Sequence, residues 1–389
     1  ITGAMAGQKA ATTVQQDFDA AQVLDGGTDA VAAVAAWKGL ERRTFGNRRT
    51  RAVVLARKAS ALVRVGRLDE AVAAARGALA GLPADDATLA SDRWNAWVTL
   101  ARIARGELDY AGAAQAFAEA ERSTKERDAV LLAQLGLIET ATFTDPDAAA
   151  AALARADALI AAAPLDKAEQ ARFADARGLL LLNRGDVAGA RTATLAAVNL
   201  RGGLTEKTDL SDVSSRSNAA IALLLAGRQD DARRYMAMTG AGRLSKGSFD
   251  PGAEMTPPDC SGEAGLKPSD MAVVEFSVGD DGSVAIVQPV YAAGGGGVAL
   301  EFARAARRWS WTPEQVKALP PFFRYRARVE LRCTQAFERP SVYDGLRGRL
   351  AAWLDGKGQA LPPRERGAGV RAADAQRKTL AAADGPAAL

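Results

Sequence analysis

Apolar side chains recur at helical spacing through most of the first 240 residues of this chain. Small-residue turns, each followed by an acidic and alanine-containing helix start, interrupt the pattern about every 40 residues. These turns lie at Gly26, Gly66, Gly106, Thr144–Pro146, Gly185 and Gly227. The periodicity predicts about six helical hairpins over residues 15–240, stacked in sequence order as a right-handed superhelix.

The clearest copy of the repeat runs from Leu55 to Leu82, with its turn at Gly66. Ala71 and Ala78 follow the turn on one helix face, and Pro83 closes the unit. This spacing resembles a tetratricopeptide repeat, in which small residues allow paired helices to approach closely. An irregular alanine-rich helical bundle is the alternative interpretation.

The composition changes after residue 240. Residues 241–268 are rich in glycine, proline, serine and charge, which is typical of a linker. Apolar residues then alternate, which predicts a two-stranded hairpin around Asp281-Gly282, a helix over Val298–Trp309 and a strand over Phe322–Leu331. We therefore expect a small α+β domain over residues 269–335. Residues 1–14 are expected to be disordered or a tag remnant, and residues 336–389 to form a helical and then flexible basic tail.

Residues 271–333 resemble the TonB C-terminal domain family. The resemblance rests on the order strand, Asp-Gly turn, strand, glycine loop, helix, Trp309-Ser310-Trp311-Thr312-Pro313 corner and final strand. It implies an antiparallel sheet with one helix, one of the two tryptophans as a core plug, and an envelope setting. It also implies that a sheet edge pairs with an extended segment of an outer-membrane receptor or another envelope protein.

The last predicted strand carries a stripe of arginines on one face. We expect the apolar face to meet the helix and the arginine face to remain in solvent. The stripe is then a candidate surface for an acidic partner, peptidoglycan or anionic headgroups, and a merely solvated sheet face is the alternative. Its members are Arg324, Arg326, Arg328 and Arg332.

Two further features were weighed as binding sites. By the usual positions in helical repeats, groove candidates lie on the first helix of each hairpin, at Arg93, Arg172, Asp175 and Asn183. Gly294–Gly297 precedes a predicted helix but lacks the Gly-Lys-[Ser/Thr] ending of a phosphate loop. That run is therefore read as a strand-to-helix connection.

The composition of the chain limits the kinds of functional site that we expect. The chain has no histidine and a formal charge of only +4, and it shows no nucleophile motif. We expect no catalytic centre, no metal, no cofactor and no nucleic-acid partner. No apolar run approaches the roughly 20 residues of a membrane span, so the chain as given is expected to be soluble.

The two cysteines, Cys260 and Cys333, bracket the predicted α+β domain. They match neither a CxxC pair nor a zinc knuckle. A disulfide between them would staple the open ends of a small domain and would fit an oxidising compartment. Two free thiols in a cytoplasmic protein are the alternative.

Together these patterns predict a multidomain chain: an all-α solenoid of tetratricopeptide-like hairpins followed by a small α+β domain similar to the TonB C-terminal domain. The function expected is that of a non-catalytic periplasmic adaptor of a Gram-negative bacterium, with a protein or peptide in the repeats and a second envelope partner on the α+β domain. A TonB-type energy transducer that has lost its membrane anchor is the alternative. An enzyme is disfavoured by the absence of histidine and of a nucleophile motif.

Overall fold

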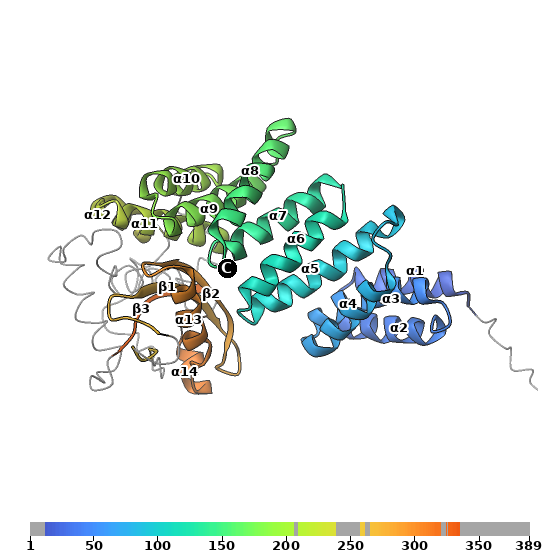
Figure 1. The fold of residues 1–389 in the computed structure, drawn as a ribbon. Coiled ribbons are helices and arrows are strands. Elements are labelled where there is room, and N and C mark those ends of the chain that lie inside the picture. The colour runs from blue at the N-terminus through green and yellow to red at the C-terminus, as the bar shows by residue number, and fades with distance from the viewer. Residues whose placement is uncertain are drawn as a thin grey trace, which may run out of the picture. The chain divides into compact units, whose positions relative to one another are not determined.

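A computed structural model of the 389-residue chain describes residues 12–205, 209–238, 257–260, 265–319, 324 and 326–334 (Figure 1). The chain divides into two compact units, the first ending at Gln134 and the second beginning at Leu135. The predicted tail, residues 336–389, lies outside the described residues, as does most of the predicted linker. Of the predicted N-terminal remnant, Thr13 caps the first helix and Val14 begins it.

The first unit consists of helices joined by short turns. Side chains of Thr13, Asp29, Asn47 and Asp109 cap helices of this unit, because free N–H groups at a helix start need an acceptor. The last helix of the unit continues into the second unit. The helices are α1 (Val14–Asp25), α2 (Ala30–Arg43), α3 (Arg48–Arg64), α4 (Leu68–Gly81), the 3₁₀ turn η1 (Ala87–Leu89), α5 (Ala90–Gly106), α6 (Tyr110–Ser123) and α7 (Arg127–Ala141).

The second unit continues with five helices, each packed against the next along the chain from α9 onward. The described residues thus hold twelve α-helices before the first strand, which confirms the predicted helical stretch; their assembly into a superhelix stays a prediction. These five are α8 (Pro146–Ala162), α9 (Lys167–Asn183), α10 (Val187–Leu200), α11 (Leu210–Leu225) and α12 (Gln229–Ala237).

The alanines that the repeat pattern places at helix contacts are buried. Ala71 and Ala78 of α4 and Ala190 of α10 are completely buried. Of the predicted turn glycines, Gly66, Gly185 and Gly227 have positive φ angles. The turn after α5 differs, because Gly106 ends the helix and Leu108 takes the left-handed conformation instead.

A three-stranded antiparallel sheet with the order β2-β1-β3 follows the helices. The last strand is shorter than the alternation of residues suggested, since β3 begins only at Ala327. The elements are β1 (Met271–Val278), β2 (Val284–Ala292), β3 (Ala327–Arg332), α13 (Gly296–Arg307) and the short α14 (Pro313–Ala318). The start of the predicted last strand, residues 322 and 323, lies outside the described residues.

Both faces of this sheet are covered. Helix α13 packs on β1 and β2, and buries Phe302 and Ala303 completely. On the other face, Met271 and Val273 share a buried apolar cluster with Ile221 of α11. Figure 1 shows the sheet beneath α9 and α11. The sheet and helices α9 and α11 therefore form one core within the second unit.

The prediction that the arginine face of the last strand is exposed to solvent is accordingly wrong. Arg328 is 2% exposed and Glu330 is completely buried, because helix α11 lies over this side of the strands. The nearly continuous apolar run of β1 is the sequence signal for this burial on both faces, since a sheet covered on one side only would alternate more cleanly.

The tryptophan corner closes one end of the sheet. Trp309 meets the ring of Phe276 edge-on at 5.4 Å, and Trp311 stacks on it at 5.7 Å. Trp311 N–H donates to the carbonyl of Gly282 in the hairpin turn, where any Cβ would lie 1.9 Å from the Trp311 carbonyl oxygen. Both tryptophans fill the core, whereas the family resemblance implied one.

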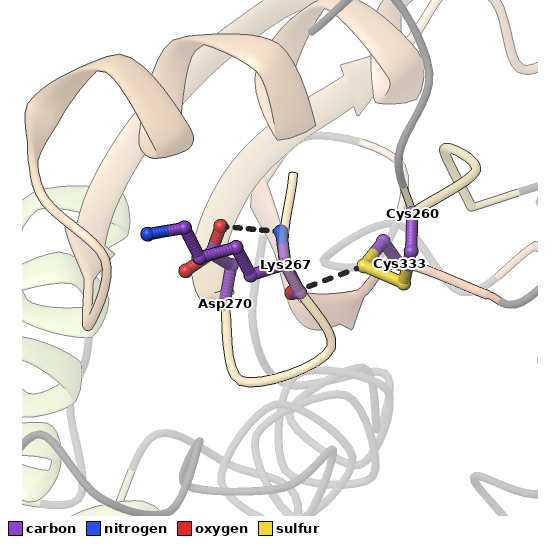
Figure 2. Close-up of a disulfide and its surroundings, with 4 residues drawn as sticks. All are labelled: Cys260, Lys267, Asp270 and Cys333. Atoms are coloured by element: carbon purple, nitrogen blue, oxygen red, sulfur yellow. Dashed lines mark hydrogen bonds between the residues drawn. A yellow bond between two sulfur atoms is a disulfide. The ribbon is translucent and has the colours of Figure 1, made fainter. Parts of the chain in front are cut away.

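Cys260 and Cys333 form a disulfide, as predicted (Figure 2). Next to it, Cys260 N–H donates to the carbonyl of Thr334, and Thr334 N–H donates to the carbonyl of Pro258. Sγ of Cys333 lies 3.2 Å from the carbonyl oxygen of Lys267, whose turn leads into β1. The disulfide therefore joins the segment before β1 to the end of β3.

Candidate functional site

The polar side chains of the second unit converge where α9 and α11 meet the sheet. Glu275 of β1 lies at the centre and is 5% exposed. Its carboxylate accepts hydrogen bonds from Arg328 Nε at 2.6 Å, Gln288 Nε2 at 2.8 Å and Arg326 Nη1 at 3.2 Å. Burial raises the pKa of Glu275, but the charges of Arg328 and Arg326 outweigh this effect and hold the pKa below its ordinary value.

Arg328 connects this cluster to the helices. Its Nη1 donates to Asn218 Oδ1 at 2.7 Å, and Asn218 Nδ2 donates to Asp175 Oδ1 of α9 at 2.9 Å. Ser215 Oγ donates to the other oxygen of Asp175, and Arg201 Nε donates to Ser215 Oγ at 2.8 Å. We call Glu275, Arg328, Asn218, Asp175 and Ser215 the docking network.

Asp175 differs electrostatically from Glu275. Its side chain is 15% exposed, and its nearest guanidinium, on Arg201, is 3.8 Å away. Burial raises the pKa of Asp175, and the hydrogen bonds from Ser215 and Asn218 with the charges of Arg201 and Arg328 offset this only in part. The network thus holds one well-compensated carboxylate and one poorly compensated carboxylate.

Asn183, the last residue of α9, makes a second link to the sheet. Its Nδ2 donates to the carbonyl of Val290 at 3.1 Å, and its Oδ1 accepts from Ala292 N–H at 3.1 Å. The side-chain amide of Asn183 thus hydrogen-bonds to one carbonyl and one N–H of β2 that a neighbouring strand would otherwise bind. This closes the outer edge of β2 at that end.

The rest of the β2 edge is more open. Ile286 is 65% exposed and its neighbour Ala285 is also exposed. Pro289 and the irregular pairing around Val290 separate this stretch from the part held by Asn183. At the opposite edge of the sheet, all residues of β3 from Ala327 to Leu331 are buried. Among the described residues, Ala285 and Ile286 therefore make the segment Val284–Gln288 the accessible edge.

The predicted partner-binding residues fall into different settings. Arg328 of the sheet contacts α11, Asn183 contacts the sheet, and Asp175 accepts hydrogen bonds from Ser215 and Asn218 of α11. All three are engaged within the chain, so their predicted role toward an outside partner is corrected. Arg326 also turns inward, to Ser214 and Glu275. Arg324 pairs with Asp280 in the hairpin turn, and Arg332 is partly buried.

In the repeats, Arg93 is buried and its guanidinium donates to the carbonyls of Pro83 and Asp86. It holds the connection between α4 and α5, which is a structural role. Arg172 is exposed on α9 and keeps its place as a candidate.

Sequence reasoning missed Glu275, Ser215 and Asn218. The signal was present, since Glu275 interrupts an apolar strand and the polar run at residues 214–218 sits inside an otherwise apolar helix.

Across the part of the chain that the structure describes, no group of three or more Cys, Asp or Glu residues is placed to hold a metal ion. Within the same residues, no helix is both long and apolar enough to cross a membrane. No protein-family model matches this chain, and no curated protein matches its sequence.

Proposed function

We propose that this chain is a non-catalytic adaptor of the periplasm, with tetratricopeptide-like repeats for one protein or peptide partner and a TonB-like domain for a second. The observation that carries the proposal is the accessible edge Val284–Gln288 on a sheet that is otherwise enclosed. An exposed strand edge offers unpaired main-chain groups to an extended peptide.

The docking network favours an adaptor over an energy transducer. A transducer of the TonB type needs a domain that reaches away from the rest of the chain. Here separation of the sheet from α9 and α11 would expose the Leu182–Met271 cluster and leave Arg328 without Asn218. Breaking a buried charged contact is costly, so a fixed domain fits the arrangement better.

The docked sheet also changes where the repeats are free to bind. Asn183 of α9 is engaged by the sheet, and Asp175 of α9 is engaged by Ser215 and Asn218 of α11. Equivalent first helices in the first unit, α3 and α5, keep two polar pairs in which the α3 residue, Arg57 or Ser60, is partly exposed and the α5 residue is buried. Arg57 Nε lies 3.0 Å from Asp92 Oδ1, and the hydroxyls of Ser60 and Thr99 are 3.3 Å apart. We place the peptide-binding surface of the repeats on α3 and α5.

The disulfide supports the periplasm as the compartment, because such bonds persist in oxidising surroundings. It secures the segment before β1 against the end of β3, and so holds the sheet in place while its β2 edge is engaged.

Site-specific photocrosslinking tests the edge. A benzoylphenylalanine at Ile286 should give a discrete adduct with another envelope protein in Gram-negative cells. The same group at Val31, which is 72% exposed in the first unit, should not give that adduct. Ile286→Lys, which places a charge on the edge, should reduce co-purification of the crosslinked protein by about tenfold or more.

Absence of any adduct at Ile286, or the same adduct from Val31, would contradict binding at the edge. An adduct that persists when the partner segment is N-methylated at alternate residues would show that side chains alone make the contact.

A further inference from the structure

The turn between α2 and α3 is held firmly at both sides. Thr44 Oγ donates to the carbonyl of Leu40, and Asn47 N–H donates to the carbonyl of Thr44, each at 2.9 Å. Asn47 Oδ1 accepts from Thr50 N–H at 3.0 Å and so caps α3. Phe45 and Gly46 therefore stand at the tip of an ordered turn.

Phe45 is 72% exposed at this tip. Its ring contacts the guanidinium of Arg51, whose central carbon lies 4.8 Å from the ring centre. The buried aromatic of the same helix pair, Trp37, packs instead against Phe18 at 5.2 Å. A single exposed apolar side chain is common on protein surfaces, so the significance of Phe45 depends on the charged groups around it.

Arginines surround the exposed ring. Five lie between residues 42 and 51, and three of them pair with a carboxylate: Arg43 with Asp17, Arg49 with Asp86 and Arg51 with Glu41. All three remain well exposed, at 39%, 59% and 36% of their side chains. The set is Arg42, Arg43, Arg48, Arg49 and Arg51.

Positive charge stays in excess at this turn after the pairing. Arg42 is exposed at the end of α2. Arg48 is exposed as well, and its Nη2 donates to a carbonyl, that of Ala80, rather than to a carboxylate. Glu41 is shared between Arg51 and Lys58, whose Nζ lies 2.6 Å from it. We call residues 42–51 the arginine turn.

We propose that the arginine turn binds an anionic lipid surface, with Phe45 entering the headgroup layer and the guanidinium groups contacting lipid phosphates. A bilayer interface presents phosphates above an apolar boundary, and the turn presents cations around one apolar tip. Guanidinium groups suit phosphate contacts because several donors lie in one plane.

A nucleic acid fits the same features less well. Single-stranded nucleic acid is usually held along a groove in which successive bases stack on successive aromatics. The arginine turn has one aromatic, Phe45, on a projecting tip. The geometry therefore favours a surface over a strand.

Vesicle sedimentation of the full chain tests the proposal. Binding to phosphatidylglycerol vesicles should exceed binding to phosphatidylcholine vesicles and weaken as salt is raised. Phe45→Ser should lower the partition coefficient about tenfold. Arg42→Glu should lower it about 25-fold, since each unit of charge contributes about fivefold and this substitution changes the charge by two units.

Matched controls keep the same chemical change but move it elsewhere in the first unit. Val31→Ser removes an equally exposed apolar side chain at the start of α2, and Arg76→Glu reverses an exposed charge on α4. Both should bind vesicles as the unmodified chain does. Circular dichroism should show that all four variants are folded.

Three results would overturn the proposal: equal loss in the test and control variants, equal binding to both kinds of vesicle, or tighter binding of a single-stranded oligonucleotide than of vesicles at the same salt. None depends on the β2 edge, so failure here leaves the proposed adaptor function to be decided by its own crosslinking experiment.

Discussion

Two buried carboxylates of the docking network should respond to acid in opposite ways. The pKa of Glu275 is lowered, because Arg328 and Arg326 outweigh the effect of burial. The pKa of Asp175 is raised by burial, which its weaker partners do not cancel. A carboxylate whose pKa is lowered by folding adds stability at pH values above its pKa in the unfolded chain. A carboxylate whose pKa is raised by folding adds stability at pH values below its unfolded pKa and loses this contribution as the pH rises through the folded pKa.

Urea unfolding of the second unit, measured between about pH 3 and pH 7, should separate the two effects. Relative to Glu275→Gln, the unmodified chain should gain free energy of unfolding as the pH rises toward 4.5, the ordinary pKa of glutamate. Relative to Asp175→Asn, it should lose free energy of unfolding as the pH rises above 3.8 through the raised pKa.

Asp147→Asn, which changes a side chain that is 91% exposed, provides the control for the general effect of removing one carboxylate. Slopes of the same sign for the Glu275 and Asp175 variants would mean that the two carboxylates do not occupy the different environments described.

At the scale of elements, the start of helix α13 depends on one close contact. A Cβ on Gly296 would lie 1.9 Å from the carbonyl oxygen of Phe143, whereas a Cβ on Gly297 would meet no atom within 4 Å. Gly296 therefore has no room for a side chain, whereas the next position of the same helix, Gly297, has room for one.

Gly296→Ala should destabilise the second unit by about 1–3 kcal/mol, because α13 must move away from Phe143. Gly297→Ala should be neutral or stabilise it by up to about 1 kcal/mol, since alanine favours helix. Thermal unfolding measures both. A Gly296 variant as stable as the Gly297 variant would remove this contact from the description of the fold.

The elements themselves could largely be predicted from the sequence, because their signals are local. Helical periodicity, turn glycines such as Gly66 and the Asp281-Gly282 hairpin depend on neighbouring residues only. The environment of Arg328 could not be predicted in this way. Its alternation with apolar residues fits solvent exposure equally well, and only the packing of α11 over the sheet decides between the two.

The contacts of the candidate site could not be predicted from local sequence signals either. Asp175 and Asn183 were expected to face a groove, from repeat positions alone, and both do make specific polar contacts. Asp175 binds Ser215 and Asn218 of α11, and Asn183 binds the chain's own sheet, more than 100 residues away along the sequence. Pairing over such separation leaves no periodic signal.

At the scale of the whole molecule, the sheet shares its compact unit with helices α8–α12. The Leu182, Ile221 and Met271 side chains belong to one buried cluster, so these helices and the sheet should unfold together. The disulfide closes a loop of 73 residues inside this unit. Loss of the disulfide should therefore destabilise the helices of the second unit as well as the strands.

Cys260→Ala with Cys333→Ala should lower the free energy of unfolding of the second unit by roughly 4 kcal/mol, because the unfolded chain regains the entropy of an open loop. Calorimetry should show this transition moving to lower temperature while that of the first unit stays in place. A reductant should shift the transition of the unmodified chain in the same way and leave that of the double variant unchanged.

Thiol titration under denaturing, non-reducing conditions decides whether the bond exists in the cell. Two free thiols in protein from its native host would remove both the crosslink and the strongest support for a periplasmic setting.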